Sequence, residues 1–265
     1  MSSPFHFLFP ADYFHKQQVD DIFSAEADAL QQAGFSVSTV DLDEMKLFRL
    51  PELNSETRVV YRGWMLKKEN YSDLIEKIQA SKNQVLIDLD TYLSTHHLPN
   101  WYPLIQDLTP ETIVLPETID LEQKLQELNW NAYFIKDYVK SLKTAQGAII
   151  HQPHEIHDLI SAMKQFRGEI EGGLCVRHVE DFNTETEQRY FVLNGKVFAA
   201  NQEQIIPEIV QDCAKRIQSP FFSVDLVIRK DGIARIIEIG DGQVSDLVGW
   251  SPSRFATIWS ETDVN

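Results

Sequence analysis

The chain has 265 residues, 43% of them hydrophobic and 24% charged, which is the composition of a folded globular protein rather than of a disordered one. Its formal net charge of −16 repels phosphate backbones, so the chain as a whole does not suit nucleic-acid binding, although solubility alone also explains the acidity. Cys175 and Cys213 are the only cysteines and have no CxxC spacing, which argues against a disulfide framework or structural zinc and indicates a reducing compartment.

The first residues form an apolar run, Phe5 to Phe9, with no basic residue before it and Asp12 shortly after it. We therefore expect a first β-strand there and not a signal peptide. No apolar run approaches the roughly 20 residues that cross a bilayer. The sequence predicts a cytoplasmic protein without a membrane partner.

The first hundred residues predict a small α/β domain. After the strand at Phe5 to Phe9, Val19 to Ala33 shows the spacing of an amphipathic helix closed by Gly34, and Phe35 to Val40 alternates as a strand. This βαβ order implies a parallel sheet, whose ligands usually bind at the carboxyl ends of the strands. The pattern continues with a strand at 59–61, a helix at 71–80 and a strand at 84–88.

Between residues 91 and 116 the chain is rich in aromatic residues and proline, and we expect a domain boundary near residue 110. Beyond it the Asn194-Gly195 pair, between two strand-like runs, is the strongest hairpin signal in the chain. The other elements expected here are strands at 133–135, 148–150, 174–179, 222–228 and 233–239, and helices at 155–167 and 206–218.

Two acidic residues stand inside apolar strands, Asp225 and Glu238. A carboxylate buried in a strand is costly unless it is paired or binds a cation. Because the two strands are joined by a turn at Asp231-Gly232, we expect both carboxylates to face one side, where their oxygens suit Mg²⁺ and substrate phosphates. Asp241 adds a third acid, which turn formation alone also explains. For either strand acid taken alone, a solvated strand face is the alternative.

Lys136 ends a strand and opens a polar loop that contains Lys140. A lysine in this position can reach the phosphates of a nucleotide, and a solvated lysine-rich loop is the alternative.

Further charged residues follow the strand at 174–179. Glu180 and Asp181 come directly after it, and Glu187 and Arg189 lie beyond. An acid there can accept from a ribose hydroxyl and an arginine can hold an anion, while ordinary surface charge accounts for them equally well.

This order of parts resembles the ATP-grasp superfamily, most clearly from Tyr133 to Gly242. In that family a lysine before a flexible loop contacts the nucleotide phosphates, and residues after the next strand hold adenine. A later glutamate takes the ribose hydroxyls, and acidic residues that include a Glu-x-Asn pair bind magnesium. The resemblance implies ATP and Mg²⁺ as cofactors.

The resemblance also implies a role for individual residues. It implies phosphate binding by Lys136, adenine binding by Val179, Glu180, Asp181 and Phe182, ribose binding by Glu187, and metal binding by Asp225 and Glu238. Arg189, Arg62 and Lys140 become the catalytic candidates that would hold the substrate carboxylate or stabilise its acyl phosphate.

The sequence departs from the family pattern at two places. The glycine-rich stretch after the lysine is absent, and Gly240 stands where the family has the asparagine of Glu-x-Asn, which makes Asp241 the candidate third metal ligand. The stretches at 61–64, 97–102 and 134–141 are similar to a bacterial and phage branch of the superfamily.

The fold class that follows is α/β (α+β), an ATP-grasp fold preceded by a small α/β pre-ATP-grasp domain. The expected boundaries are 1–110 for the substrate-binding domain and 111–265 for the ATP-grasp domain, with its lid at about 130–180 and its core at about 181–265.

Three functions remain open. The first is an ADP-forming carboxylate–amine or carboxylate–nucleophile ligase, which would act on a small-molecule or peptide carboxylate. The second is a non-catalytic ATP-binding protein on this fold, and the third is a kinase-like phosphotransferase. Motifs of P-loop proteins, of hydrolases with a nucleophile elbow and of zincins are absent from the sequence. The sequence identifies neither the substrates nor the oligomeric state.

Overall fold

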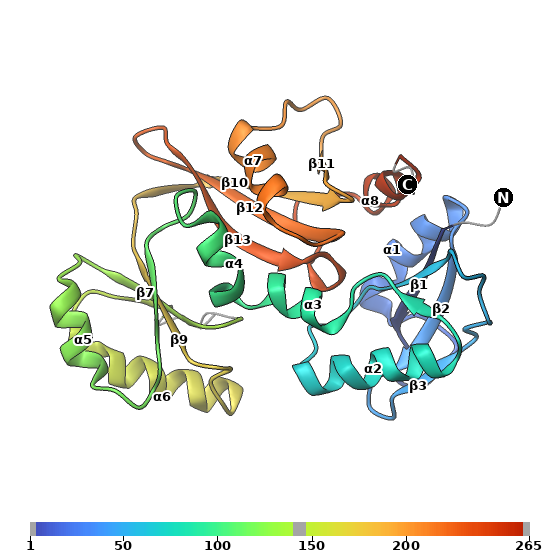
Figure 1. The fold of residues 1–265 in the computed structure, drawn as a ribbon, viewed down its shortest axis with the longest axis horizontal. Coiled ribbons are helices and arrows are strands. Elements are labelled where there is room, and N and C mark those ends of the chain that lie inside the picture. The colour runs from blue at the N-terminus through green and yellow to red at the C-terminus, as the bar shows by residue number, and fades with distance from the viewer. Residues whose placement is uncertain (1–3, 140–146, 262–265) are drawn as a thin grey trace. The chain divides into compact units, whose positions relative to one another are not determined.

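A computed structural model describes residues 4–139 and 147–261 of the chain (Figure 1). The chain divides into two compact units. The first comprises Met1–Ser94, Gln188–Val224 and Gly240–Asn265, and the second comprises Thr95–Glu187 and Asp225–Ile239. These units are defined by contacts alone, so the functional boundary at residue 110 stays a prediction.

The first unit contains a five-stranded sheet of order β3-β2-β1-β4-β5. β1 pairs in parallel with β2 and β4, and β4 with β5, whereas β3 is antiparallel to β2. The predicted parallel sheet is therefore confirmed. The elements of this segment are β1 (Phe5–Pro10), α1 (Asp21–Gln32), β2 (Ser36–Asp41), β3 (Lys46–Phe48), β4 (Arg58–Tyr61), α2 (Lys68–Ala80), β5 (Gln84–Val85) and α3 (Leu89–His96).

The core of the first unit joins this sheet to later parts of the chain. Phe5 and Phe7 each pack edge-on against Trp259 at 4.9 Å between ring centroids, and Phe221 packs against the same indole at 4.7 Å. All three phenylalanines are at most 3% exposed. Burial of such large aromatic side chains supplies most of the hydrophobic stabilisation of a core.

The second unit is built around a four-stranded antiparallel sheet of order β6-β9-β7-β8. Two helices, α5 and α6, cover one face of it through an apolar cluster that includes Leu125, Tyr133, Leu159 and Val176. Its elements are α4 (Leu98–Ile105), β6 (Thr112–Leu115), α5 (Leu121–Leu128), β7 (Tyr133–Asp137), β8 (Ile149–Ile150), η1 (Pro153–Glu155), α6 (Ile156–Arg167) and β9 (Leu174–His178).

A third sheet has the order β11-β10-β12-β13. The predicted hairpin is confirmed, because β10 and β11 are antiparallel and Asn194 and Gly195 both have positive φ, 49° and 78°, as a two-residue hairpin turn of this type requires. The remaining elements are β10 (Phe182–Leu193), β11 (Lys196–Ala199), α7 (Glu208–Arg216), β12 (Phe221–Arg229), β13 (Ala234–Asp241), η2 (Gly242–Val244) and α8 (Pro252–Ser260).

The largest local difference from the sequence prediction lies between residues 89 and 105, where α3 and α4 replace the expected irregular segment. Pro99 occupies the first turn of α4, where its missing N–H removes no helical hydrogen bond. Pro103 lies inside this eight-residue helix, so reading it as a helix breaker was wrong. The predicted strand at 84–88 is also shorter, since β5 ends at Val85.

Candidate functional site

The face of the second unit's sheet opposite the two helices carries polar residues. Tyr133 and Ile135 of β7 and Val176 of β9 belong to the apolar cluster under the helices. Because side chains alternate along a strand, Lys136 of β7 and Arg177 of β9 point to the other face. Their strands are neighbours, with Lys136 opposite Cys175 and Phe134 opposite Arg177 in the register.

Lys136 reaches across to Glu238 of β13. Its Nζ lies 3.4 Å from Glu238 Oε1, and 7% of the lysine side chain is exposed against 47% of the glutamate side chain. The two residues that the sequence assigns to phosphate and metal therefore pair with one another. An ammonium on this buried face is held by the carboxylate, while the carboxylate keeps part of its surface open to solvent.

The two predicted strand acids differ in their surroundings. Asp225 of β12 is 4% exposed, as expected for an acid inside an apolar strand. The matching expectation for Glu238 was wrong, because its side chain is about half exposed at 47%. Alternation of side chains explains the error, since bulky neighbours at positions i ± 1 lie on the opposite face of a strand and do not cover position i.

Asp241, the third candidate ligand, is fully buried in the first unit. Its Oδ1 accepts from the backbone N–H of Gln243 at 3.0 Å and begins η2. The Gln243 amide lies 3.3 Å from the same oxygen and donates to Tyr71 Oη at 2.7 Å. These contacts give Asp241 a structural role. Within residues 4–139 and 147–261, no group of three or more His, Cys, Asp or Glu is arranged to hold a metal ion, so the three-acid site stays a prediction.

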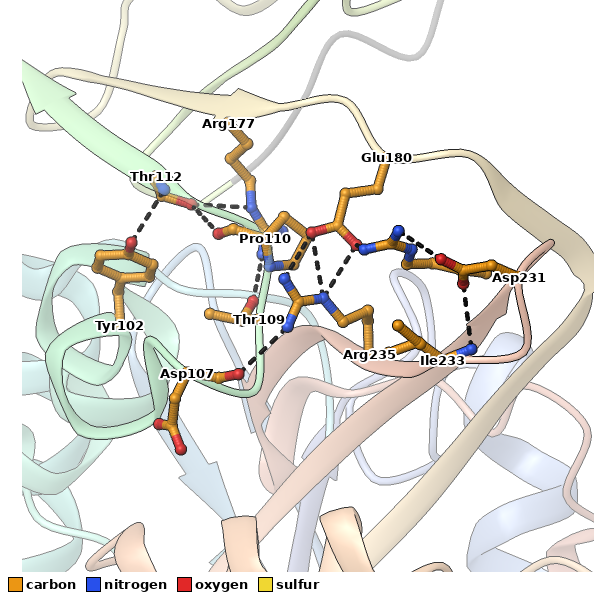
Figure 2. A network of polar contacts seen from close by, with 11 residues as sticks. Tyr102, Asp107, Thr109, Pro110, Thr112, Arg177, Glu180, Asp231, Ile233 and Arg235 are labelled. Atoms are coloured by element: carbon orange, nitrogen blue, oxygen red, sulfur yellow. Dashed lines mark hydrogen bonds and ion pairs between the residues drawn. The ribbon is translucent and has the colours of Figure 1, made fainter.

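Arg177 lies at the centre of a polar network in the second unit (Figure 2). Its Nε donates to Thr112 Oγ1 at 3.2 Å and its Nη2 to Thr109 Oγ1 at 2.5 Å. Its Nη1 donates to the carbonyl of Ile237, next to Glu238, at 2.6 Å. The side chain is 6% exposed, and burial lowers the pKa of the guanidinium to about 10, which leaves it charged at neutral pH.

The segment predicted to hold adenine follows β9 and is fixed by ion pairs. Arg235 grips the Glu180 carboxylate through Nε and Nη2, at 2.9 Å and 2.6 Å, and Arg229 adds a contact at 3.3 Å, the first of these pairs being visible in Figure 2. Lys230 binds Asp181, side chain to side chain at 2.8 Å and backbone to backbone at 2.9 Å. The side chains of Val179 and Phe182 are half-buried. This segment is held in place on its protein side.

Arg62 is a buried structural residue in the first unit. Its guanidinium forms two hydrogen bonds with the Glu26 carboxylate, at 2.5 Å and 2.9 Å, and Nη1 donates to the carbonyls of Gly242 and Ser245. It also lies 4.6 Å from the ring of Phe255. With 2% of its surface exposed, this arginine braces α1 against η2 and α8, and its catalytic role stays a prediction.

The other catalytic candidates have fewer described contacts. Arg189 is half-buried and donates from Nη1 to the carbonyl of Asp246 at 2.8 Å. Glu187, the predicted ribose ligand, is exposed in β10. Lys140 lies outside the described residues.

Two surface hollows of the described chain are remote from these residues. One of about 670 Å³ lies between α5 and α6 and includes Glu117, Asp120, His157 and Lys164 in its lining. The other, about 330 Å³, lies beside α1 and β2 in the first unit. Neither is lined by a residue that the sequence assigns to nucleotide, metal or catalysis. Among the described helices, none has the length and apolar character needed to cross a membrane.

A family model described as an ATP-grasp domain, the third family of its clade, matches residues 112–261, which is more than half of the chain. The chain belongs to this ATP-grasp family. The resemblance read from the sequence is thereby confirmed, and so is the fold class.

Solved structures share the ATP-grasp fold over nearly the whole chain. The D-cycloserine synthetase DcsG superposes with a TM-score of 0.63 at 11% identity, covering 97% of this chain and 99% of that chain. The macrocyclase MdnC from Microcystis aeruginosa MRC, bound with its precursor peptide, gives 0.60 at 13% identity, covering 97% and 100%. D-alanyl-alanine synthetase A from Vibrio cholerae gives 0.60 at 12% identity, covering 99% of both chains. At such identities the likeness shows the fold alone. No curated protein sequence matches the chain.

Sequence reasoning overlooked Arg177 in this ATP-grasp protein. The residue stood within the predicted strand at 174–179 and received no role. Its signal was the one that singled out Asp225, a charged side chain among apolar residues of a strand, and the same cost of burial applies to a guanidinium.

Proposed function

We propose that this ATP-grasp protein is an ATP- and magnesium-dependent ligase that joins a carboxylate to an amine or another nucleophile and releases ADP. The observation that carries the proposal is the contact between Lys136 and Glu238, at 3.4 Å on an ATP-grasp fold. A buried cation and a half-open carboxylate stand side by side, which is the pair of charges that a metal-bound polyphosphate needs.

The donor set fits both cofactors. Asp225 and Glu238 offer the hard carboxylate oxygens that Mg²⁺ prefers, and the 47% exposure of Glu238 leaves it open to an incoming ion. Bound magnesium would supply charge neutralisation at the phosphates. Lys136 would exchange Glu238 for a phosphate oxygen, residues 179–182 would contact adenine, and Glu187 would contact ribose. Asp241 is proposed as a third ligand only where it can leave its contacts with Gln243.

The proposed reaction has two steps. A carboxylate oxygen of the substrate attacks the γ-phosphorus of ATP, and the bond to the β,γ-bridging oxygen breaks, which releases ADP. The nucleophile then attacks the acyl carbon of the acyl phosphate, loses a proton and expels inorganic phosphate. Arg189, Arg62 and Lys140 are the proposed candidates for holding the substrate carboxylate and the acyl phosphate, and preorganised cations of this kind stabilise the charge that develops. A small-molecule or peptide carboxylate is the proposed substrate class.

Trapping of the acyl phosphate tests this function. Purified protein would be incubated with MgATP, hydroxylamine and pools of amino acids and short peptides. A ligase is expected to yield ADP and a hydroxamate in equal amounts, and Asp225→Asn with Glu238→Gln is expected to abolish both products. ATP binding without ADP release for any pool would contradict the ligase and favour the non-catalytic binder. A stable phosphorylated product without hydroxamate would favour the phosphotransferase.

A further inference from the structure

Arg177 is a buried cation whose direct partners are all uncharged. Its three hydrogen bonds end on Thr112 Oγ1, Thr109 Oγ1 and the carbonyl of Ile237. A guanidinium has five N–H donors, so two of them have no acceptor within the described part of the chain. Burial of a charged group without a charged partner costs several kcal/mol, roughly, in a protein interior. The arrangement therefore leaves both charge and donors for a ligand.

The nearby acids are committed to other cations. Glu180 is held by Arg235 and Arg229 at distances from 2.6 Å to 3.3 Å. Glu238 pairs with the ammonium of Lys136. The polar face of this sheet thus presents two cations, Lys136 and Arg177, to one half-exposed carboxylate, and the unbalanced charge is positive.

The register gives these two cations an order along the sheet. Lys136 stands opposite Cys175, and Arg177 lies two residues further along β9, on the same face and toward the segment at 179–182. Both side chains end at consecutive residues of β13, Ile237 and Glu238. A diphosphate has neighbouring anionic groups and can engage two neighbouring cations, whereas one carboxylate can satisfy one of them.

We propose that Arg177 and Lys136 form an anion subsite for a polyphosphate, in which Arg177 binds the phosphate nearer the segment at 179–182. The inference deepens the proposed function, since ATP is the polyphosphate that a ligase of this family would use. Arg177 would act as a binding residue that also holds the backbone beside Glu238. Its planar fork of donors suits two phosphate oxygens, which a lysine ammonium cannot match.

Inorganic pyrophosphate tests the subsite without metal, nucleotide or catalysis. Its affinity would be measured by titration calorimetry in EDTA for the full chain and for Arg177→Met, Arg177→Lys and Arg235→Met. We expect Arg177→Met to weaken pyrophosphate binding about tenfold or more and Arg177→Lys to weaken it by about threefold, because the charge remains but the fork is lost. Arg235→Met removes a structural arginine of the same network, so it should lower the midpoint of thermal unfolding and leave the affinity unchanged.

Equal pyrophosphate affinity of the wild type and Arg177→Met would overturn the subsite, as would a wild type that does not bind pyrophosphate. Where Arg177→Met does not fold, Arg177→Lys decides, and an unchanged affinity in that variant would contradict the proposal. Failure of the ligase is distinguishable, because pyrophosphate binding that depends on Arg177 can persist in a protein that forms no hydroxamate. An active ligase whose pyrophosphate affinity ignores Arg177 would contradict this inference alone.

Discussion

Lys136 and Glu238 show how single residues of this protein compete for ligands. Their contact of 3.4 Å neutralises a lysine side chain that is only 7% exposed. A cation near Glu238 must displace the ammonium, and an anion near Lys136 must displace the carboxylate. A metal-bound polyphosphate replaces both partners at once, so the two ligands should bind more tightly together than separately.

Removal of the lysine should separate these effects. In Lys136→Met, Glu238 loses its ammonium partner, so we expect affinity for Mn²⁺ alone to rise and affinity for ADP in EDTA to fall by about tenfold. Calorimetric titrations of each ligand measure both values. Lys124→Met is the control, because Lys124 forms an exposed pair with Glu127 on α5 and should leave both affinities unchanged. An unaltered ADP affinity in Lys136→Met would show that this lysine does not contact the nucleotide.

His6 is a second residue with a distinct electrostatic role. Its Nε2 lies 2.7 Å from Ser38 Oγ, which donates to the carbonyl of Arg49 at 2.8 Å. Because the serine hydrogen is engaged with that carbonyl, Nε2 must carry the hydrogen of the first bond. The chain of bonds connects β1 to β2 and to the residue after β3. Burial lowers the pKa of His6 to about 4 from 6.5.

This lowered pKa predicts a pH dependence of folding. Below about pH 6.5 the unfolded chain binds a proton at this residue that the folded chain refuses until about pH 4. The stabilisation is therefore complete above that window and is lost as the pH falls through it, by an amount on the order of 3 kcal/mol. Urea unfolding of the wild type and of His6→Gln across this range measures the difference. Parallel pH profiles for the two proteins would contradict the assignment.

Among the secondary-structure elements, α1, η2 and α8 of the first unit meet at Arg62. The ion pair with Glu26 is buried, with 3% and 7% of the two side chains exposed. Loss of one partner strands the other charge in the interior, so we expect Arg62→Met to lower the free energy of unfolding by roughly 3–5 kcal/mol.

Urea denaturation of the full chain measures this loss for Arg62→Met. The matched control is Lys82→Met, which removes a pair with Glu52 whose side chains are 74% and 65% exposed and should cost at most about 1 kcal/mol. A loss as small as that of the control would mean that Arg62 is replaceable in the fold, and its predicted catalytic role would gain weight.

How far the sequence predicts the structure also differs between elements. Strong local signals were sufficient for the βαβ start at Phe5 and for the Asn194-Gly195 hairpin, because both depend on nearby residues. The helix α4 was overlooked because Pro99 and Pro103 suggest a break, while its side chains Trp101 and Ile105 are buried by tertiary packing. Exposure of Glu238 likewise depends on what covers one strand face, which its own neighbours in sequence do not reveal.

The candidate site shows the same division. Lys136 and Glu238 were named from the sequence and lie in contact in the structure. Arg177 became visible only through its hydrogen bonds with Thr109, Thr112 and Ile237, which are far apart in the chain. Lys140 lies outside the described residues.

At the scale of the whole molecule, the chain is an ATP-grasp protein with residues in both of its compact units assigned to one reaction. Lys136, Asp225 and Glu238 belong to the second unit, and Arg189 and Asp241 to the first. The account therefore depends on whether the acidic and basic residues of the second unit bind a metal–nucleotide complex.

Calorimetric titration of ADP in the presence and absence of Mg²⁺ tests this claim most directly. We expect binding that Mg²⁺ strengthens, and we expect the Asp225→Asn, Glu238→Gln double variant to lose the effect of Mg²⁺ while it retains a folded thermal unfolding transition. The two substitutions remove the carboxylate charge with little change of shape, so a lost magnesium effect reports on the site. A wild type that does not bind ADP, or a double variant with the full magnesium effect, would contradict the account.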